Sequence, residues 1–400
     1  MTHSPAATFP IPRTCPFSPP AEYTELQERA PVSRVTLPTG ATAWVLTRHA
    51  DIRAMLADPR FSSDRTNPGF PILVEGQDRL VASFPPSLIS MDPPAHGPAR
   101  RAVVGEFTVR RMEAMRPRIQ QIVDEYLDLM LAGPRPADLV QALSLPVPSR
   151  VICELLGVPY ADHDFFQSRS SAFLRRSTPV EERIRARDEL RSYLDELVSR
   201  KERIPADDLL GRQVTKRREN GAASHGDLVS LALLLLVAGH ETTANMISLG
   251  TLALLEHPGD IAAIREDPGK TPGAVEELLR YFTIAELAAS RVATADVEIG
   301  GVLIRAGEGV VTLGSSANRD PEAFDHPDEL DIGRGARHHV AFGFGPHQCL
   351  GQNLARTELQ IVFDTLFRRV PGLRIAAPVG DLPFKDDGSI YGLYALPVTW

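Results

Sequence analysis

The feature that most constrains this chain is a short glycine-rich stretch near its end, residues 342 to 351 (FGFGPHQCLG). Three glycines and a proline within ten residues predict a tight turn whose backbone can approach a large, flat object closely. Cys349 stands at the end of this turn, and from Leu350 onward apolar residues recur at helical spacing. A thiol at a helix N-terminus lies at the positive end of the helix dipole, which favours the thiolate. The stretch therefore predicts a thiolate that can ligate a metal.

Two other interpretations of this cysteine are open from the residues alone. One is a buried structural cysteine that follows a turn. The other is a zinc site formed by His338, His339, His347 and Cys349. Adjacent histidines seldom both bind one zinc ion, and the paired CxxC or HxxxH spacings of zinc sites are absent here, so the zinc interpretation is the weaker one.

The same stretch resembles the haem-binding loop of the cytochrome P450 superfamily, FxxGxHxCxG, at Phe342, Gly345, His347, Cys349 and Gly351. The resemblance implies that Cys349 is the axial thiolate ligand of the iron in haem b. It also implies that His347, two residues before the thiolate, donates to a haem propionate.

A second informative segment runs from about residue 227 to residue 256 and predicts one helix of roughly 30 residues, about 45 Å long. Its first half is apolar on almost every side. A membrane span is disfavoured, because His240, Glu241 and Asn245 interrupt the apolar run before the ~20 residues that a span requires. An apolar helix of this length is instead expected to lie buried at the centre of the protein.

Inside this predicted helix lies the sequence AGHETT, residues 238 to 243. A buried carboxylate needs partners, and threonine hydroxyls can bond back to the carbonyl four residues earlier and distort the helix. A helix bend without a catalytic role is one interpretation. The stretch also resembles the oxygen-binding motif of the P450 superfamily at Gly239, Glu241 and Thr242, which implies that Glu241 and Thr242 are catalytic and deliver protons to bound dioxygen.

Further matches to the superfamily involve cationic side chains. His96 and Arg100 are four residues apart on one face of a predicted helix, which suits an anionic group, although a solvent-facing pair has the same spacing. By resemblance, His96, Arg100 and Arg291 bind haem propionates. The resemblance also implies a buried ionic triad, which is structural and not catalytic, formed by Glu277, Arg280 and Arg334.

The order of predicted elements indicates a mainly α protein. We expect a hairpin at residues 31 to 49, a short helix from His49 to Ala57, and a long loop at 62 to 90 with room for a turn of helix. From Arg291 to Ile304 we expect a strand, a turn and another strand. Helices are predicted at 112 to 132, 136 to 156, 160 to 173 and 181 to 203. The resemblance implies the cytochrome P450 fold, with a large helical part, a smaller β-rich part and the haem between the long central helix and the helix that follows Cys349. We expect one domain over residues 1–400, with a proline-rich arm at 1–30.

Charge and cysteine content limit the partners and the compartment. A net charge of −8 argues against nucleic acid as a partner. Residues 100 to 118 nevertheless carry six arginines against two glutamates, which predicts either a solvated surface or a docking patch for an acidic protein. Three scattered cysteines (Cys15, Cys153, Cys349) predict no disulfide framework. No secretion signal or membrane anchor is expected, and we expect a cytoplasmic, monomeric protein.

The resemblance implies a haem-thiolate monooxygenase that inserts one oxygen atom from O2 into a bulky apolar substrate, such as a macrolide, terpenoid or sterol-like secondary metabolite. The chain has neither a dinucleotide-binding GxGxxG unit nor a cysteine cluster. Electrons are therefore expected from NAD(P)H through a separate ferredoxin and ferredoxin reductase. A peroxygenase or isomerase on the same haem scaffold, a non-catalytic haem sensor, and a metal-free structural protein are the alternatives. The turn at residues 390 to 393 is expected to form part of the substrate pocket.

Overall fold

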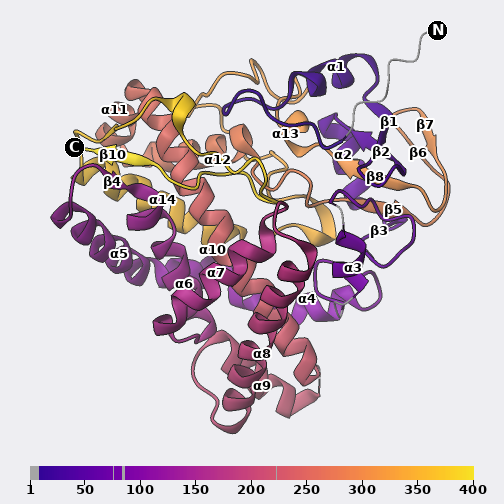
Figure 1. Cartoon of the computed structure of the whole chain (residues 1–400), viewed down its shortest axis with the longest axis horizontal. Helices are drawn as coiled ribbons and strands as arrows, with labels where there is room; N and C mark the ends of the chain where they lie inside the picture. The colour runs from indigo at the N-terminus through magenta and orange to yellow at the C-terminus, as the bar shows by residue number, and fades with distance from the viewer. Residues whose placement is uncertain (1–8, 75, 83–85, 222) are drawn as a thin grey trace. The chain divides into compact units, whose positions relative to one another are not determined.

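The structure is a computed structural model that describes residues 9–74, 76–82, 86–221 and 223–400 (Figure 1). The chain divides into two compact units, each assembled from separate stretches. Unit 1 comprises the described residues up to His96, together with Leu279–Asp331 and Ala336–Cys349; unit 2 comprises Gly97–Leu278, Ile332–Gly335 and Leu350–Trp400.

Unit 1 is built on a five-stranded sheet with the strand order β1-β2-β8-β5-β3. Its strands are β1 (Val32–Thr36), β2 (Thr42–Leu46), β3 (Phe61–Ser62), β5 (Arg291–Ala293) and β8 (Gly309–Thr312). The predicted hairpin is confirmed, because β1 and β2 pair antiparallel through a turn in which Gly40 has a φ of +81°. β8 then adds parallel to β2, so residues more than 260 positions apart in the chain lie side by side, as in the pair Trp44 and Val310.

Both faces of this sheet are covered by apolar residues. Adjacent residues alternate between two core clusters, because side chains of a strand point to opposite faces. Leu46 and Val310 belong to one cluster, whereas Val45 and Val311 belong to the other. The first cluster also contains Ile52, whose helix, α2 (His49–Ala57), therefore covers that face.

A two-stranded hairpin, β6 (Val297–Ile299) with β7 (Val302–Ile304), follows β5. The two residues of its turn, Gly300 and Gly301, have φ values of +56° and +75°. Two successive positive φ values are the requirement of the tightest hairpin turns, and glycine meets it without strain. The strand, turn and strand predicted after Arg291 are thus confirmed.

The helices of unit 1 are short. They are α1 (Ala21–Arg29), α2 (His49–Ala57), α3 (Gln77–Ala82), α13 (Gly314–Ala317) and the 3-10 turn η5 (Gly345–His347). The bounds of α2 agree with the prediction. The proline-rich arm expected at 1–30 contains the helix α1, while its first eight residues lie outside the described residues. The loop expected at 62 to 90 contains the helix α3, and residues 75 and 83–85 of that loop are not among those described.

Unit 2 holds most of the long helices. They are α5 (Val109–Ala132), α6 (Pro146–Leu156), α7 (His163–Leu174), α8 (Val180–Arg203), α9 (Leu209–Asn220), α10 (His225–Glu256), α11 (Pro258–Glu266) and α14 (Gln352–Arg369). Two further helices, α4 (His96–Val104) and α12 (Thr271–Phe282), contain chain positions where one unit gives way to the other. Short turns η1 (Gly105–Phe107), η3 (Tyr160–Asp162), η4 (Pro268–Lys270) and η6 (Val379–Asp381) and a small sheet of β4 (Ala137–Asp138), β10 (Pro397–Thr399) and β9 (Arg374–Ile375) complete the unit. The expectation of a mainly α protein with a smaller β-rich part is confirmed.

The long helix α10 is central to unit 2, where it packs against α6, α8 and α14. It begins at a capping box, in which the Ser224 and Asp227 side chains satisfy each other's backbone N–H groups, and it ends before Pro258. Among the described residues, α10 is the one helix long and apolar enough to cross a membrane, but 67% of its most apolar window is buried within the protein. The prediction of a buried central helix is therefore confirmed.

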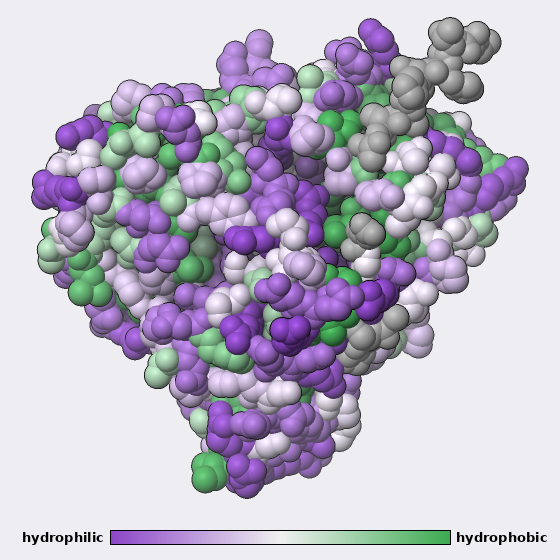
Figure 2. Space-filling model, viewed as in Figure 1, coloured by the Kyte–Doolittle hydropathy of each residue, from purple (hydrophilic) through white to green (hydrophobic). Residues whose placement is uncertain are grey.

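By contrast with α10, the helices α8 and α9 carry many charged residues. The surface over them is predominantly hydrophilic in Figure 2, at the lower end of the view. The prediction placed a helix at 181 to 203, which is confirmed as α8, but it missed α9, because α9 has little apolar periodicity. The side chain of Asp208 caps α9 by accepting a hydrogen bond from Gly211 N at 2.8 Å.

The single helix predicted at 136 to 156 is wrong in its first half. The chain there forms β4, then the π-helical turn η2 (Val140–Ser144), and only then α6. Pro136, Pro146 and Pro148 explain the break, since proline lacks the N–H group that a helix interior uses. The Asp138 side chain accepts hydrogen bonds from Val140 N and Leu396 N, which stabilises the non-helical start.

Candidate active site

The predicted tight turn before Cys349 is present in unit 1. Gly343 and Gly345 both have a φ of +70°, and a Cβ atom on Gly345 would lie 2.6 Å from the carbonyl oxygen of Leu56. The Cys349 N–H donates to the Phe342 carbonyl at 2.8 Å, which closes the turn. The following helix, α14, starts at Gln352 and not at Leu350, so the predicted helix start is two residues early.

The three cysteines differ in accessibility. Cys349 and Cys15 are exposed, whereas Cys153 is buried and burial raises the pKa of its thiol to about 12. Cys349 therefore presents an accessible thiol on a glycine-rich turn, as a metal ligand must.

The zinc interpretation does not fit the structure. Among the described residues, no group of three or more His, Cys, Asp or Glu side chains is placed to hold a metal ion. His338 instead bonds through Nε2 to the Ala323 carbonyl at 3.0 Å, and its ring stacks on Phe324.

Unit 1 brings the predicted histidines together. The rings of His96 and His347 stack with their centroids 4.0 Å apart. His347 Nε2 lies 3.0 Å from Ser63 Oγ, and the Ser63 N–H donates to Asp92 Oδ1 at 2.7 Å. The backbone N–H of His96 donates to the Asp92 carbonyl at 3.0 Å. Two histidines separated by 250 residues are thus fixed by one polar cluster around Asp92.

Arg291 is buried at the start of β5, next to this cluster. Burial, followed by the neighbouring charge of Arg65, lowers the pKa of the Arg291 guanidinium to about 10, against the opposing effect of Asp92. Burial also lowers the pKa of Arg65. Two neighbouring guanidinium groups out of bulk water favour an anion between or beside them. Arg65 was not predicted, because nothing in its local sequence pattern distinguishes it from a surface arginine.

The residues of unit 1 therefore fit a flat prosthetic group that carries carboxylates. An accessible thiol lies on a glycine-rich turn, and the same unit holds the stacked imidazoles of His96 and His347 and the guanidinium groups of Arg65 and Arg291. Arg100, the remaining predicted donor, is half-buried on α4, four residues after His96.

The residues predicted to be catalytic lie on α10 in unit 2. Thr242 Oγ1 donates to the Ala238 carbonyl at 2.7 Å, so the predicted back-bonding of threonine to the carbonyl four residues earlier is present. One face of α10, with Leu231, Leu234, Ala238 and Thr242 at helical spacing, is partly or fully open, although the residues around it are buried. This open face is apolar apart from the Thr242 hydroxyl.

Glu241 is buried beside this face, with 9% of its side chain exposed. Its Oε2 atom forms an ion pair with Lys385 Nζ at 3.3 Å. Lys385 belongs to the C-terminal segment, 144 residues away, and no local sequence pattern predicts the pair.

The neighbouring residues of the motif have structural roles. His240 is fully buried, its Nδ1 atom bonds to the Leu236 carbonyl at 2.6 Å, and burial lowers its pKa. A Cβ atom on Gly239 would lie 2.8 Å from Ile152 on α6. Glycine is therefore required at this position for the close packing of α10 on α6.

Comparison with known proteins decides the family. The sequence model of the family Cytochrome P450 matches residues 171–370. Pentalenic acid synthase of Streptomyces avermitilis is 53% identical over 98% of this chain and 97% of its own length, and vitamin D3 dihydroxylase of Streptomyces griseolus is 50% identical over 99% and 97%. The crystal structure of cytochrome P450 MoxA from Nonomuraea recticatena matches with a TM-score of 0.92 and 60% identity over 98% of each chain.

The chain belongs to the cytochrome P450 family. It has the P450 fold, and it is a monooxygenase that uses a haem iron, O2 and electrons supplied from outside to oxidise an organic substrate. The alternatives of a haem sensor and of a metal-free structural protein are therefore set aside.

Within unit 2, two members of the predicted ionic triad form an ion pair. Arg334 Nε lies 3.1 Å from Glu277 Oε1, and Glu277 is fully buried. In unit 1, the fully buried Arg280 donates to the carbonyls of Asn318 and Pro327, each at 2.7 Å. Buried charges with several hydrogen bonds of this kind order the loops that they join.

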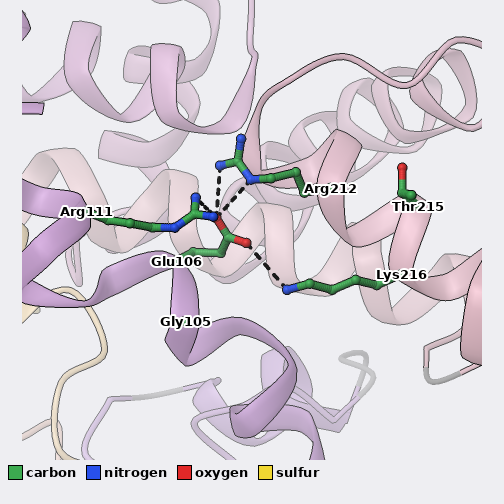
Figure 3. Close-up of a pocket in the computed structure, with 6 residues that line it drawn as sticks. All are labelled: Gly105, Glu106, Arg111, Arg212, Thr215 and Lys216. Carbon is green, nitrogen blue, oxygen red and sulfur yellow. Dashed lines mark hydrogen bonds and ion pairs between the residues drawn. The ribbon is translucent and has the colours of Figure 1, made fainter. Parts of the chain in front are cut away.

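The basic stretch at 100 to 118 is partly neutralised. Figure 3 shows Arg111 of α5 and Arg212 and Lys216 of α9 converging on the carboxylate of Glu106, which is 2% exposed. The distances to Glu106 are 2.6 Å from Arg111, 2.9 Å from Arg212 and 3.5 Å from Lys216. These residues and Thr215 line a pocket of about 330 Å³. The network joins the turn η1 to α9. The charge of Arg111 is balanced within the protein by Glu106.

Arg116 and Arg118 are also paired, with Glu113 at 2.9 Å and Glu154 at 2.7 Å.

The turn at residues 390 to 393 lies against α10 within unit 2, since a Cβ atom on Gly392 would lie 2.0 Å from Asn245 Oδ1. The expected place of this turn in the substrate pocket stays a prediction.

Proposed function

We propose that Cys349 supplies the thiolate ligand of a haem b iron, and that His96, Arg100, Arg291 and His347 hold the haem propionates. The observation that carries this proposal is the accessible Cys349 thiol on the same loop as His347, whose ring stacks on His96. Haem with a thiolate ligand supplies an oxidant strong enough to attack C–H bonds.

The protein's own contribution would be to bind, to orient and to move protons. Glu241 and Thr242 are the proposed catalytic residues, because α10 presents an acid and a hydroxyl next to its open face. Proton delivery requires such groups within hydrogen-bond reach of the reacting oxygen. The apolar residues Leu234 and Ala238 on that face would exclude water and align the substrate.

The proposed substrate is a bulky, mostly hydrocarbon secondary metabolite. The open apolar face of α10 supports this class, and so do the names of two relatives, which refer to pentalenic acid and to vitamin D3. Which compound is oxidised, and at which carbon, would be found by screening such compounds for shifts of the haem absorption spectrum.

For electron supply, we propose a ferredoxin and a ferredoxin reductase that draw on NAD(P)H, and we propose that the chain acts as a cytoplasmic monomer with residues 1–400 as one functional domain. The experiment is reconstitution of the purified holoenzyme with a ferredoxin, its reductase, NADPH and ¹⁸O₂. One labelled oxygen atom in the product is expected. Product formed only with added peroxide would instead support the peroxygenase alternative.

A further inference from the structure

The ion pair between Glu241 and Lys385 is the feature of unit 2 that the family resemblance did not predict. We propose that Lys385 is a positioning residue of the active site, whose ammonium group holds the Glu241 carboxylate charged and at a fixed place on α10. The proposal rests on the proposed role of Glu241 in proton delivery and identifies what controls that acid.

The first support is that the pair is shielded from solvent. Lys385 Nζ lies 3.3 Å from Glu241 Oε2, and only 17% and 9% of the two side chains are exposed. Within the part of the chain that the structure describes, Lys385 is the only cation paired with Glu241. A buried carboxylate is costly without a counter-charge, and Lys385 supplies that counter-charge to Glu241.

The second support is that the backbone of Lys385 is held in place. Its N–H donates to the Gly392 carbonyl at 2.8 Å, and its carbonyl accepts from Gly388 N at 3.1 Å. The ammonium group also lies 5.4 Å from the centroid of the Tyr394 ring, a distance that suits a cation–π contact.

The turn that carries Lys385 (residues 385–389) is hydrogen-bonded to the connection between α7 and α8. Arg176 N donates to the Asp387 carbonyl at 2.7 Å, and Ser389 N donates to the Leu174 carbonyl at 3.1 Å. Arg175 and Gly388 form an isolated β-bridge. Lys385 therefore extends from a loop whose backbone is held in place by hydrogen bonds.

The remaining titratable groups near the pair do not replace either partner. His240, adjacent on α10, is fully buried and its lowered pKa keeps it uncharged. Asp387 is engaged with the Tyr394 hydroxyl at 2.6 Å and with Ser177. Burial and the hydrogen bond to Asp387 raise the pKa of Tyr394 to about 12, so Tyr394 stays neutral too.

The first test measures the stability of the holoenzyme by urea unfolding at pH 6 and pH 8.5. In K385M the carboxylate loses its counter-charge, and the uncharged acid becomes the favoured form. The folded state then binds a proton that the unfolded state does not bind, so the unfolding midpoint is expected to fall as the pH rises. K385R and K385M/E241Q are expected to lack this added pH dependence, and K270M, which changes an exposed lysine, is the matched control.

The second test measures O2 consumption by the same variants with a plant-type ferredoxin, its reductase and NADPH between pH 6 and pH 8.5. K385M is expected to gain a pH dependence, with a change of about tenfold in rate, that wild type, K385R and K270M lack. A K385M profile that superimposes on wild type would overturn the proposal, even if the stability test shows the pair, because the pair would then be structural only. Unchanged O2 consumption in E241Q would instead contradict the proposed proton role of Glu241, and the stability test would still decide whether Lys385 holds it.

Discussion

The side chain of Thr242 shows how one residue can satisfy its helix and still face a reaction. Its hydroxyl hydrogen is donated to the Ala238 carbonyl, while its oxygen lies on the open face of α10 and can accept a further hydrogen bond. The neighbouring Thr243 has the same side chain but is buried. Because the two threonines are adjacent on α10 and differ in exposure, a variant of Thr243 can serve as the control for a variant of Thr242.

We expect T242A to lower the yield of product per electron by about tenfold, because a hydroxyl used in proton delivery is lost. T242S should recover most of the yield. T243A is the matched control, and it should affect stability more than yield because Thr243 is buried. Product and peroxide are measured together, and an unchanged yield in T242A would contradict the proposed role.

The thiols allow a second test at the residue scale. Cys153 should resist alkylation by iodoacetamide at pH 8 in the folded protein, since it is buried and its thiol pKa is about 12, whereas the exposed Cys15 should react. Cys349 should react only after haem is removed. Mass spectrometry of the labelled peptides measures each site, and rapid labelling of Cys349 in the haem-loaded protein would be inconsistent with ligation.

At the scale of elements, the packing of α10 on α6 depends on Gly239. G239A should destabilise the protein by about 2 kcal/mol, because a methyl group would collide with Ile152. G226A is the control on the same helix, where the added methyl group meets nothing closer than 3.8 Å and alanine favours the helix. Adding I152A to G239A should cost less than the sum of the single changes, and strict additivity would argue against this contact.

The start of α10 is joined to α8 by His225, which lies 3.0 Å from Asp195 and 3.1 Å from Glu202. Burial lowers the pKa of His225, but hydrogen bonds to these two carboxylates outweigh it and raise the pKa above 6.5. The resulting stabilisation is full below pH 6.5 and is lost as the pH rises through the raised pKa. Unfolding midpoints at pH 6 and pH 8.5 should therefore differ more in wild type than in H225Q.

Local elements of this fold could be predicted from the sequence, and distant pairings could not. The bounds of α2 and the hairpins follow from apolar alternation, glycine and proline, which act within a few residues. The Glu241–Lys385 pair and the proximity of Arg65 to Arg291 depend on chain segments that meet only in the folded unit. Charged α9 was missed because its helix is fixed by capping and by ion pairs with Glu106, not by an apolar stripe.

At the scale of the whole molecule, the basic stretch bears on the docking of an acidic redox partner. Its paired arginines are held by glutamates, but Arg101 and Arg110 are exposed, and within the described residues neither forms an ion pair. These two residues, and not Arg111, are the better candidates for docking. Their charge would act mainly on the rate of association.

We expect R101E/R110E to slow reduction by ferredoxin several-fold at low salt, with the difference shrinking as salt screens the charges. Stopped-flow reduction of the holoenzyme at two ionic strengths measures the effect. R111E should instead lower stability, because Glu106 would lose a partner. Equal reduction rates for wild type and R101E/R110E at low salt would remove this docking surface.

The most direct measurement of the central claim is the absorption spectrum of the reduced holoenzyme under carbon monoxide. Ligation of the iron by the Cys349 thiolate predicts a red-shifted Soret band in wild type and its loss in C349H, with C15S as the control that keeps it. An unshifted band in wild type, or a red-shifted band in C349H, would contradict the account.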